Sequence, residues 1–449
     1  MRARAFAYRG FMLDAARHFL PAEDVCRIIE GAAACGMNRM HWHLADDQGW
    51  RLEILKYPRL TGTGAFRDAT HFGGVSETEN NCGYYTQQEV RELVAYARTL
   101  GIDIIPEIEI PGHSAALLAA YPEMGCRRSR PGRPDAEPAD AYPYQVRVSG
   151  GIFPDLVCAG RDETLRFLED ILDEVVSLFP FPMVHIGGDE ALKVHWRRCP
   201  DCRRRMREEG LASEDELQRW LVLALGEYLH ERGRETIVWN DVLDGGFLPD
   251  YFIVQQWLNN EDRTAEWMAR GGRVICSDTR CWYFDYPYGA TDVHRIWLYP
   301  RIPDYAKGHE SRLLGIEAPL WTERITNIDR AAFMLFPRLT ALGLKAAGQD
   351  ALLWPVQKSR IARIQERIEA LGLHGAPAEF WQMSEKAAEQ DRQADLDRIY
   401  APDALPYVRA QERVIRLDAE ERELRRSGVP DDEFLPAGDA VLDGQEDPA

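Results

Sequence analysis

Short apolar strands alternate with amphipathic helices along most of this 449-residue chain, and this alternation restricts its fold more than any other feature. The pattern repeats eight times between residues 6 and 344. Eight β-then-α units are typical of a (β/α)8 TIM barrel of the α/β class. A doubly wound open sheet is the alternative, but it usually carries a glycine-rich phosphate loop after its first strand, which this sequence lacks. The predicted strands are Phe6–Leu13, Asn38–Leu44, Ile102–Ile108, the stretch from Met183, Thr236–Trp239, Phe252–Trp257, Val274–Ser277 and Leu313–Ile316.

Helix-start signals support the helical half of the pattern. Thr86 and Ser213 each precede a helical stretch, and each has a glutamate three residues later, which is the spacing of a capping box. The last helix of the barrel is predicted over Ala331–Leu344.

The composition changes after the eighth unit. We expect residues 1–375 to form the barrel, and residues 376–427, rich in Ala, Glu, Gln and Arg, to form a helical extension. This extension could pack against the barrel or form a homo-oligomer contact. Residues 428–449 are rich in Asp, Glu, Gly and Pro and are predicted to be a disordered acidic tail.

The net charge of −19 argues against nucleic acid and anionic membrane partners, because both would repel an acidic protein. No apolar run is long enough to predict a transmembrane helix. The N-terminal residues lack the apolar region of a signal peptide, so we expect a cytoplasmic location.

The nine cysteines are scattered and odd in number, which favours reduced thiols over a disulfide framework. Cys199-Pro-Asp-Cys202 is a single C-x-x-C motif. A second such motif would indicate zinc, but the sequence has none. We therefore interpret the motif as a local turn and predict no metal and no cofactor.

Charged and aromatic side chains follow every predicted strand, at the end of the barrel where active sites of this fold lie. Three of them are tryptophans after strands five, six and eight, and each alone could belong to the core. Together they suggest a pocket whose indole walls stack on sugar rings. Arg9, on the first strand, could bind hydroxyl groups or form a structural ion pair. The set comprises Arg9, His43, Asp46, Glu107, His113, Asp189, Glu190, Trp239, Trp257, Tyr283, Asp285, Glu317, Trp321 and Glu323.

Asp189 and Glu190 are adjacent and follow two glycines at the end of the fourth strand. Such a pair in an arbitrary loop is usually solvated and without function. On an extended segment, neighbouring side chains point apart, so the two acids could not flank a glycosidic bond as acid and nucleophile. This arrangement favours one acid that protonates the bond and another that orients a group on the substrate.

Seven segments of the chain resemble glycoside hydrolase family 20, the β-N-acetylhexosaminidases, in the order in which that family has them. The resemblance covers about residues 6–375. The segments begin at Arg9 (RGFMLDAARHF), His41 (HWHLADDQGWR), Pro106 (PEIEIPGH), His185 (HIGGDE), Val238 (VWND), Gln256 (QW) and Gly315 (GIEAPLWTE).

The resemblance implies substrate-assisted catalysis, in which the 2-acetamido oxygen of the substrate attacks the anomeric carbon and gives an oxazolinium intermediate. Glu190 would be the general acid/base and would need a raised pKa. Asp189 would stay ionised, hold the acetamido N–H and stabilise the positive charge. Tyr283 would hydrogen-bond the acetamido oxygen.

The same resemblance implies the substrate-binding residues. Trp239, Trp257 and Trp321 would enclose the terminal sugar. Arg9 and Glu323, with Asp285, would bind its hydroxyl groups. Asp46 and His113 would form a pair that tunes Glu190.

The sequence leaves several alternatives open. A terminal GlcNAc or GalNAc would fit, and so would a disaccharide unit, as in a lacto-N-biosidase. A non-catalytic sugar-binding barrel and a two-carboxylate glycosidase with Glu107 or Glu317 as nucleophile are further alternatives. Many family members carry a small α/β domain ahead of the barrel, whereas the first predicted strand of this sequence begins at Phe6. In the family, the cysteines around Cys126 and Cys158 flank the long third loop, so the resemblance implies that the two could lie close together here, paired or unpaired.

Overall fold

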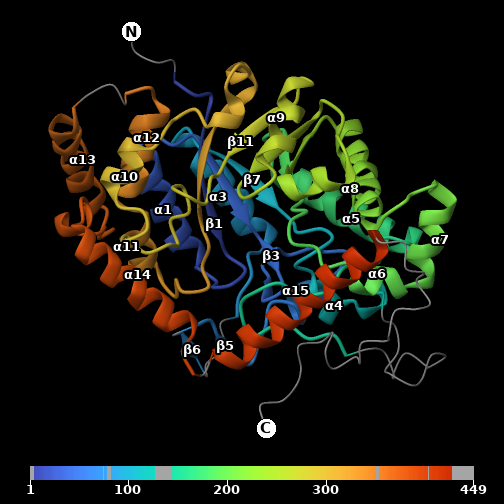
Figure 1. Ribbon diagram of the computed structural model, residues 1–449. Helices are drawn as coiled ribbons and strands as arrows, with labels where there is room; N and C mark the ends of the chain where they lie inside the picture. The colour runs from blue at the N-terminus through green and yellow to red at the C-terminus, as the bar shows by residue number, and fades with distance from the viewer. Residues whose placement is uncertain are drawn as a thin grey trace.

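The computed structural model describes residues 5–73, 75–77, 82–126, 143–349, 353–402 and 404–426. Eight parallel strands close into a barrel in the order β1-β12-β11-β10-β9-β8-β7-β2, which confirms the predicted (β/α)8 fold (Figure 1). The strands are β1 (Tyr8–Asp14), β2 (Arg39–His43), β7 (Asp103–Glu107), β8 (Met183–His185), β9 (Glu235–Trp239), β10 (Phe252–Gln256), β11 (Arg273–Cys276) and β12 (Leu313–Leu320).

Helices surround the barrel, and shorter elements occupy the loops. The helices that follow successive strands are α1 (Ala22–Ala34), α3 (Gln87–Thr99), α5 (Asp162–Leu178), α8 (Glu214–Glu231), α9 (Glu261–Ala269), α10 (Val293–Leu298), α11 (Ile328–Leu335) and α12 (Arg338–Ala346). The short loop elements are α2 (Arg59–Gly62), α4 (Ala115–Ala120), α6 (Val194–Arg198), α7 (Pro200–Glu209), the strand pairs β3 (Ala45–Asp46) with β4 (Gly49–Trp50) and β5 (Thr70–His71) with β6 (Ser76–Glu77), and the 3-10 turns η1 (Pro122–Met124), η3 (Asn240–Gly245), η4 (Asp304–Ala306) and η5 (Glu310–Arg312).

Both predicted helix caps are present, but only one is a complete capping box. The Thr86 side chain accepts from the N–H of Glu89, and the Glu89 carboxylate accepts from the N–H of Thr86. Ser213 likewise accepts from the N–H of Glu216. The carboxylate of Glu216, however, accepts from the N–H of Ala212 at 2.7 Å and so lies one residue further back.

The predicted helix Ala331–Leu344 is wrong as a single element. The chain forms α11 and α12 instead, and Pro337 stands between them. Proline has no N–H to donate and its ring clashes with the preceding turn, so the helix is interrupted there.

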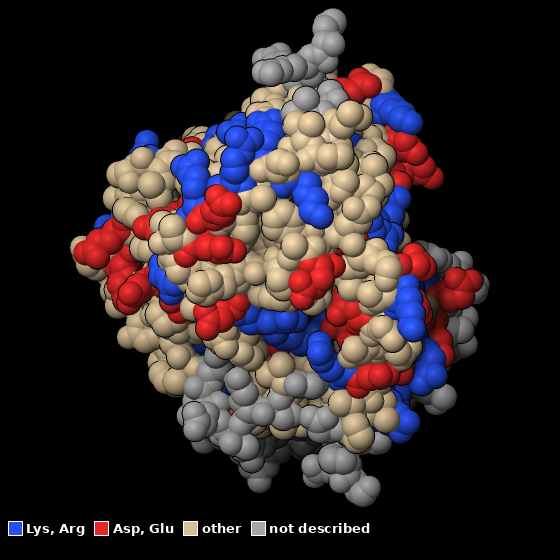
Figure 2. All heavy atoms as spheres, turned by 90° about the vertical axis from the view of Figure 1, so that its left-hand side faces the viewer, with Lys and Arg blue, Asp and Glu red and all other residues tan. Residues whose placement is uncertain are grey.

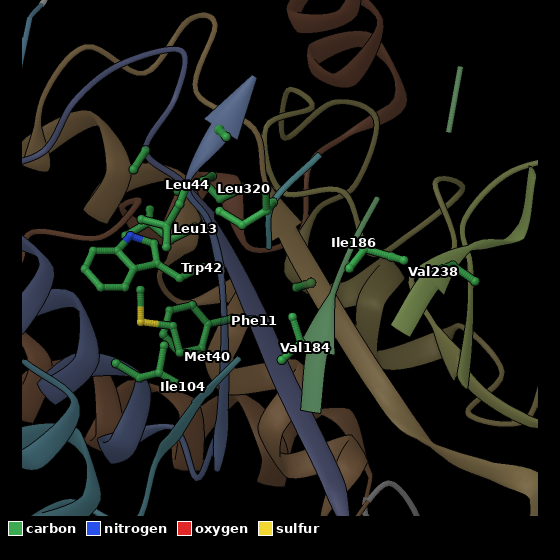
Figure 3. Packing of buried hydrophobic residues seen from close by; sticks show 14 of the residues in the cluster. Phe11, Leu13, Met40, Trp42, Leu44, Ile104, Val184, Ile186, Val238 and Leu320 are labelled. Atoms are coloured by element: carbon green, nitrogen blue, oxygen red, sulfur yellow. The ribbon is translucent and has the colours of Figure 1, made fainter. Parts of the chain in front are cut away.

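Side chains alternate along the barrel strands and separate the apolar core from the polar interior. Phe11 and Leu13 of β1 pack with Met40 and Trp42 of β2 on the outside of the barrel, under the helices (Figure 3). Because successive residues of a strand face opposite sides, the histidines of β2 then point inward. The barrel interior holds only a small apolar cluster at its base, made of Tyr8, Ile105, Ile237, Ile253 and Ile275.

The C-terminal region is helical, as predicted. It comprises α13 (Trp354–Glu369), η6 (Ala378–Phe380), α14 (Glu385–Ile399) and α15 (Leu405–Arg426). Figure 1 shows α14 and α15 running along the barrel, with α15 reaching from β5 and β6 to α6.

Ion pairs hold α15 on the barrel. The guanidinium of Arg197 lies 2.9 Å from Asp418 and 2.9 Å from Glu421. The ring of Tyr407 stacks on His71 with the centroids 5.2 Å apart. The extension therefore packs on its own barrel, and an oligomer contact through it stays a prediction. The predicted acidic tail lies outside the described residues.

Figure 2 shows one face of the molecule, on which acidic and basic side chains lie beside one another among uncharged residues. Such mixing is typical of a solvated protein surface. Among the described residues, no helix combines the length and the apolar character needed to cross a membrane.

Candidate active site

Asp189 and Glu190 lie just beyond β8, at the mouth of the barrel. The backbone there is not extended, because Gly187, Gly188 and Glu190 all have positive φ, at 67°, 104° and 48°. Both carboxylates consequently approach Nε2 of His113, at 3.7 Å from Asp189 and 3.6 Å from Glu190. The expectation that the two side chains point apart on an extended segment is therefore wrong, and a left-handed turn places both on one histidine.

Burial raises the pKa of both acids, which suits Glu190 as a proton donor but opposes the expectation that Asp189 stays ionised. Burial raises the pKa of Glu190 to about 8; the cation of His113 opposes this shift, and the charges of Asp189 and Asp241 add to it. Burial also raises the pKa of Asp189 to about 7. Oδ1 of Asp189 is buried and has no hydrogen-bond partner among the described residues. This oxygen is an acceptor held in a dry position without a donor, which is costly unless a ligand supplies one.

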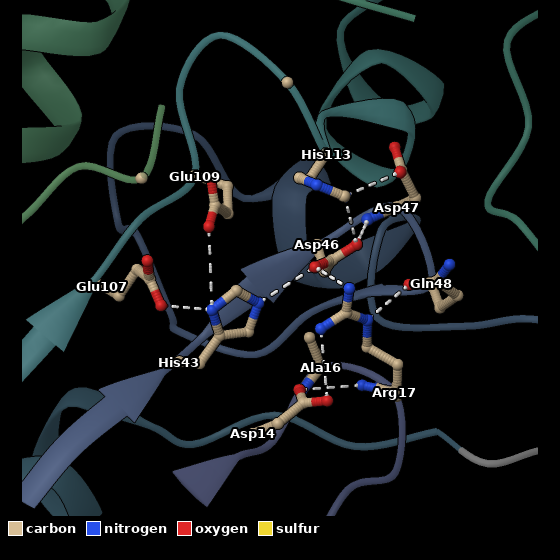
Figure 4. A network of polar contacts seen from close by, with 12 residues as sticks. Asp14, Ala16, Arg17, His43, Asp46, Asp47, Gln48, Glu107, Glu109 and His113 are labelled. Atoms are coloured by element: carbon tan, nitrogen blue, oxygen red, sulfur yellow. Dashed lines mark hydrogen bonds and ion pairs between the residues drawn. The ribbon is translucent and has the colours of Figure 1, made fainter. Parts of the chain in front are cut away.

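A chain of charges runs from His113, which both acids approach, through Asp46 to Arg17 (Figure 4). Nδ1 of His113 lies 3.3 Å from Asp46 and 3.2 Å from Asp47. Asp46 in turn lies 2.7 Å from the guanidinium of Arg17. Burial alone would lower the pKa of His113, but Asp46, Asp47 and Asp189 hold it well above its usual range. His113 is therefore a cation, and it moderates the pKa of both acids.

Four aromatic side chains line the mouth as a connected wall. The ring centroids of Trp239 lie 6.5 Å from those of Trp257 and 6.1 Å from those of Trp321. Tyr283 stacks on Trp257 at 6.1 Å and lies 6.4 Å from Trp321. Burial raises the pKa of Tyr283 well above its usual range, so its hydroxyl stays protonated and can donate. Such a wall suits the C–H faces of a sugar.

Comparison with known proteins agrees with this geometry. The model for "Glycosyl hydrolase family 20, catalytic domain" matches residues 6–346. The chain belongs to glycoside hydrolase family 20. A beta-hexosaminidase of Porphyromonas gingivalis is 36% identical over 393 residues, which are 83% of this chain and 46% of that protein. A beta-hexosaminidase of Vibrio furnissii is 36% identical over 76% of this chain and 56% of its own length.

Solved structures show the same family 20 fold. The crystal structure of a beta-N-acetylhexosaminidase from Bacteroides fragilis is 31% identical, covers 85% of this chain and 75% of its own, and superposes with a TM-score of 0.71. The chain spans about half the length of the two curated relatives named above.

The prediction that Arg9 binds substrate is wrong. Arg9 lies near the start of β1 on the same side of the strand as Phe11 and Leu13, which face the helices. Its guanidinium donates to the carbonyl oxygens of Gly36 at 2.8 Å and Phe6 at 2.9 Å. A residue on that side of the strand cannot reach the interior of the family 20 barrel.

Arg17 of the same segment lies at the mouth instead. Besides its ion pair with Asp46, it donates to Oε1 of Gln48 at 3.0 Å. Its guanidinium lies 4.9 Å from the ring centroid of Trp321. Arg17 lies three residues beyond the end of β1, and that position past the strand is the signal the sequence offered.

Asp241 is the second residue that the sequence reasoning missed. Its Oδ2 accepts from Nε1 of Trp257 at 2.9 Å, and its Oδ1 accepts from the N–H of Glu190 at 3.3 Å. It therefore fixes one wall of the pocket and the backbone of one acid at the same time. The sequence feature that could have identified Asp241 is its position two residues beyond Trp239, where β9 ends.

Asp285 and Glu323 lie on the other side of the mouth, where they line a cavity of about 390 Å³ together with Tyr407 and Gln411 of α15. Burial and the charge of Glu323 raise the pKa of Asp285 to about 7. Oδ1 of Asp285 is buried and has no hydrogen-bond partner among the described residues. Asp285 therefore offers a free oxygen to a ligand, and the binding of hydroxyl groups by Asp285 and Glu323 stays a prediction.

Glu107 and Glu317 lie deeper in the barrel and are fully paired. Oε1 of Glu107 accepts from Nε1 of Trp239 at 2.9 Å and lies 2.8 Å from Nδ1 of His185, and its Oε2 contacts His43 and His41. Glu317 accepts from Gln255 at 2.6 Å and also contacts Tyr8 and His41. Neither carboxylate has a free oxygen with which to attack a sugar, so the geometry argues against a two-carboxylate mechanism through them.

The histidine–carboxylate groups at the mouth have the residue types of a cation site. His113, Asp189 and Glu190 form one such group. A metal requires a neutral imidazole, whereas Asp46 and Asp47 keep His113 protonated. This group therefore favours an ion-pair network over metal ligation.

Proposed function

We propose that this protein is a retaining exo-β-N-acetylhexosaminidase that releases a terminal β-linked GlcNAc or GalNAc from a glycan. The observation that carries the proposal is the unpaired, buried Oδ1 of Asp189 beside Glu190, an acid with a raised pKa. An acetamido N–H is a donor of the right kind for Oδ1. The aromatic wall around the two acids suits a sugar with an apolar N-acetyl group.

The first step breaks the glycosidic bond. The acetamido carbonyl oxygen of the substrate attacks the anomeric carbon, while Glu190 transfers its proton to the glycosidic oxygen and the alcohol leaves. The acetamido nitrogen gains positive charge in the resulting oxazolinium ring. Asp189, as a carboxylate, accepts the N–H and stabilises that charge, and the hydroxyl of Tyr283 donates to the acetamido oxygen that attacks.

The second step reverses the roles. Glu190 is now a carboxylate and takes a proton from water as the water oxygen attacks the anomeric carbon from the face that the alcohol left. The bond from carbon to acetamido oxygen breaks, and the sugar leaves with its configuration retained. Arg17, Asp285 and Glu323 would bind the ring hydroxyl groups, which revises the role first assigned to Arg9.

The test measures hydrolysis of p-nitrophenyl β-GlcNAc, β-GalNAc and β-lacto-N-bioside by the wild type, Glu190→Gln and Asp189→Asn. We expect the wild type to cleave one or both monosaccharide substrates and a thiazoline mimic of the oxazolinium to inhibit it. Both variants should be strongly impaired but folded. Cleavage of the disaccharide substrate alone would instead identify a lacto-N-biosidase, and hydrolysis insensitive to the thiazoline would contradict participation of the acetamido group.

A further inference from the structure

Four cysteines from three separate segments meet at one point away from the barrel mouth. Cys126 follows η1, Cys158 precedes α5, Cys199 lies between α6 and α7, and Cys202 belongs to the first turn of α7. Their sulfur atoms all lie within 4.8 Å of one another. Cys158, Cys199 and Cys202 are buried and Cys126 is half-buried, and all four are free thiols. The site proposed above uses none of them.

The distances among these sulfur atoms suit a metal ion at their centre. Sγ of Cys158 lies 3.7 Å from Sγ of Cys199 and 3.7 Å from Sγ of Cys202, and Sγ of Cys126 lies 3.8 Å from Sγ of Cys202. Four thiolates around Zn²⁺ at about 2.3 Å form a tetrahedron with edges of about 3.8 Å. We propose that Cys126, Cys158, Cys199 and Cys202 form a structural zinc site.

The surroundings favour thiolates over thiols. Each cysteine loses its proton when the ion binds, so the cluster has a net negative charge around Zn²⁺. The guanidinium of Arg161 supplies a positive charge that interacts with Cys158. Cys199 is the N-cap residue of α7 and Cys202 lies in its first turn, where the helix dipole favours negative charge.

The site clamps two loops of the barrel together. Gly125 and Val157 form an antiparallel bridge, and the N–H of Cys158 donates to the carbonyl of Met124 at 2.8 Å, so Cys126 and Cys158 lie side by side. The zinc ion then joins this pair to the start of α7. The loop after β7 and the loop after β8 are thereby tied at a second point beyond the barrel.

The clamped segment supports both loops that carry the proposed acids and their histidine. The N–H of Val157 donates to the carbonyl of Pro111 at 3.2 Å, two residues before His113. The carbonyl of Val157 accepts from Nε1 of Trp196 at 2.9 Å, in the helix that follows Glu190. All four ligands come from the protein and leave no open position, so the ion has a structural role and not a catalytic one.

The test measures metal in protein expressed with zinc in the medium and purified without chelators. We expect elemental analysis to give about one zinc per wild-type chain. Cys199→Ser and Cys126→Ser should lose most of it. Cys35→Ser is the matched control, because Cys35 is buried at the end of α1 and contacts Thr340, outside the cluster. It should keep its zinc.

Two further measurements keep the proposal falsifiable if the serine variants fold poorly. Replacement of zinc by Co²⁺ in the wild type should give the absorption bands of a tetrahedral thiolate complex. A chelator should lower the midpoint of thermal unfolding of the wild type and of Cys35→Ser. A wild type without stoichiometric metal, one that holds iron, or one whose four cysteines are found in disulfides by mass spectrometry would overturn the assignment.

Discussion

Two carboxylate–histidine clusters lie next to each other in the barrel and are joined by His43. They shift the pKa values of their carboxyl groups in opposite directions. Burial alone would raise the pKa of Glu107, but His185, His41 and His43 outweigh it and hold that pKa well below its usual range. At the mouth, burial prevails, and the pKa of Glu190 rises to about 8 although a cationic histidine lies nearby.

The opposite pKa shifts of Glu107 and Glu190 distinguish a carboxylate that stabilises the barrel from one that can react with a ligand. Glu107 contacts three histidines and an indole N–H through its two oxygens, so nothing is left for a ligand. The acids at the mouth share one histidine, and Asp189 keeps a buried oxygen without a partner. Similar residue types therefore form a structural ion-pair network deeper in the barrel and a proton donor at its mouth.

The largest expected effect comes from a substitution that changes only the cluster at the mouth. Glu190→Gln removes the proton donor, so kcat/KM should fall by about 10²- to 10⁴-fold. The free energy of unfolding should not decrease, because the half-buried Glu190 is not held by a strong ion pair. Steady-state kinetics and denaturant unfolding measure the two quantities. Glu169→Gln is the matched control, since burial also raises the pKa of Glu169, which lies on α5 outside the barrel mouth. A tenfold or greater loss of kcat/KM in that control would contradict the distinction.

The second prediction concerns the deeper cluster, in which Glu107 is paired with histidines. Glu107→Gln leaves protonated histidines without their counter-charge, which should cost about 3–5 kcal/mol of the free energy of unfolding. Chemical denaturation of this variant and of Glu190→Gln measures the contrast. A loss under about 1 kcal/mol would mean that Glu107 does not support the barrel in the way its contacts indicate.

A smaller effect should separate the two arginines of the first segment. Arg17→Lys loses the paired donors toward Asp46 and Gln48 and the contact with Trp321, so kcat/KM should fall by about 10- to 100-fold, mainly through KM. Arg9→Lys should change kcat/KM by less than about twofold, because the hydrogen bonds of its guanidinium to described residues go to backbone carbonyls outside the barrel. Equal effects of the two changes would contradict their placement.

The smallest expected effect is a shift in the pH dependence of kcat/KM. Activity needs a protonated Glu190, so kcat/KM should decline as the pH rises through about 8. The cation of His113 lowers the pKa of both acids, and His113→Gln removes it. The low-pH limb, set by ionisation of Asp189, and the high-pH limb, set by loss of the Glu190 proton, should then both move to higher pH, by about one unit or less. A shift of the basic limb to lower pH would be the opposite of what this charge arrangement requires.

Much of the fold and part of the site could be predicted from the sequence. The eight strands are predictable because each is a short apolar run bounded by turn residues, and the position of Asp189, Glu190 and Tyr283 at the barrel mouth is predictable because they follow strand ends. The motif that contains Arg9 and Arg17 does not show which side of the strand each residue faces, so it does not tell the site residue from the structural one. The left-handed turn at Glu190 does not follow from a strand pattern, which predicts an extended segment.

Other features depend on contacts that no local pattern encodes. Arg197 and Asp418 are far apart in the chain, and only the folded structure brings them within 2.9 Å. The four cysteines behave likewise, because a single C-x-x-C motif does not reveal Cys126 and Cys158. Tertiary contacts of this kind are set by the barrel that forms between the segments.

The position of α15 has a consequence for biosynthesis. Tyr407 and Gln411 complete the cavity that Asp285 and Glu323 line, yet they are translated after every strand of the barrel. Domains form from the N-terminus as the chain emerges from the ribosome, so the barrel can close before this helix arrives. A nascent chain that ends near the close of α14 would contain the proposed acids and the aromatic wall, but one side of its mouth would still be open.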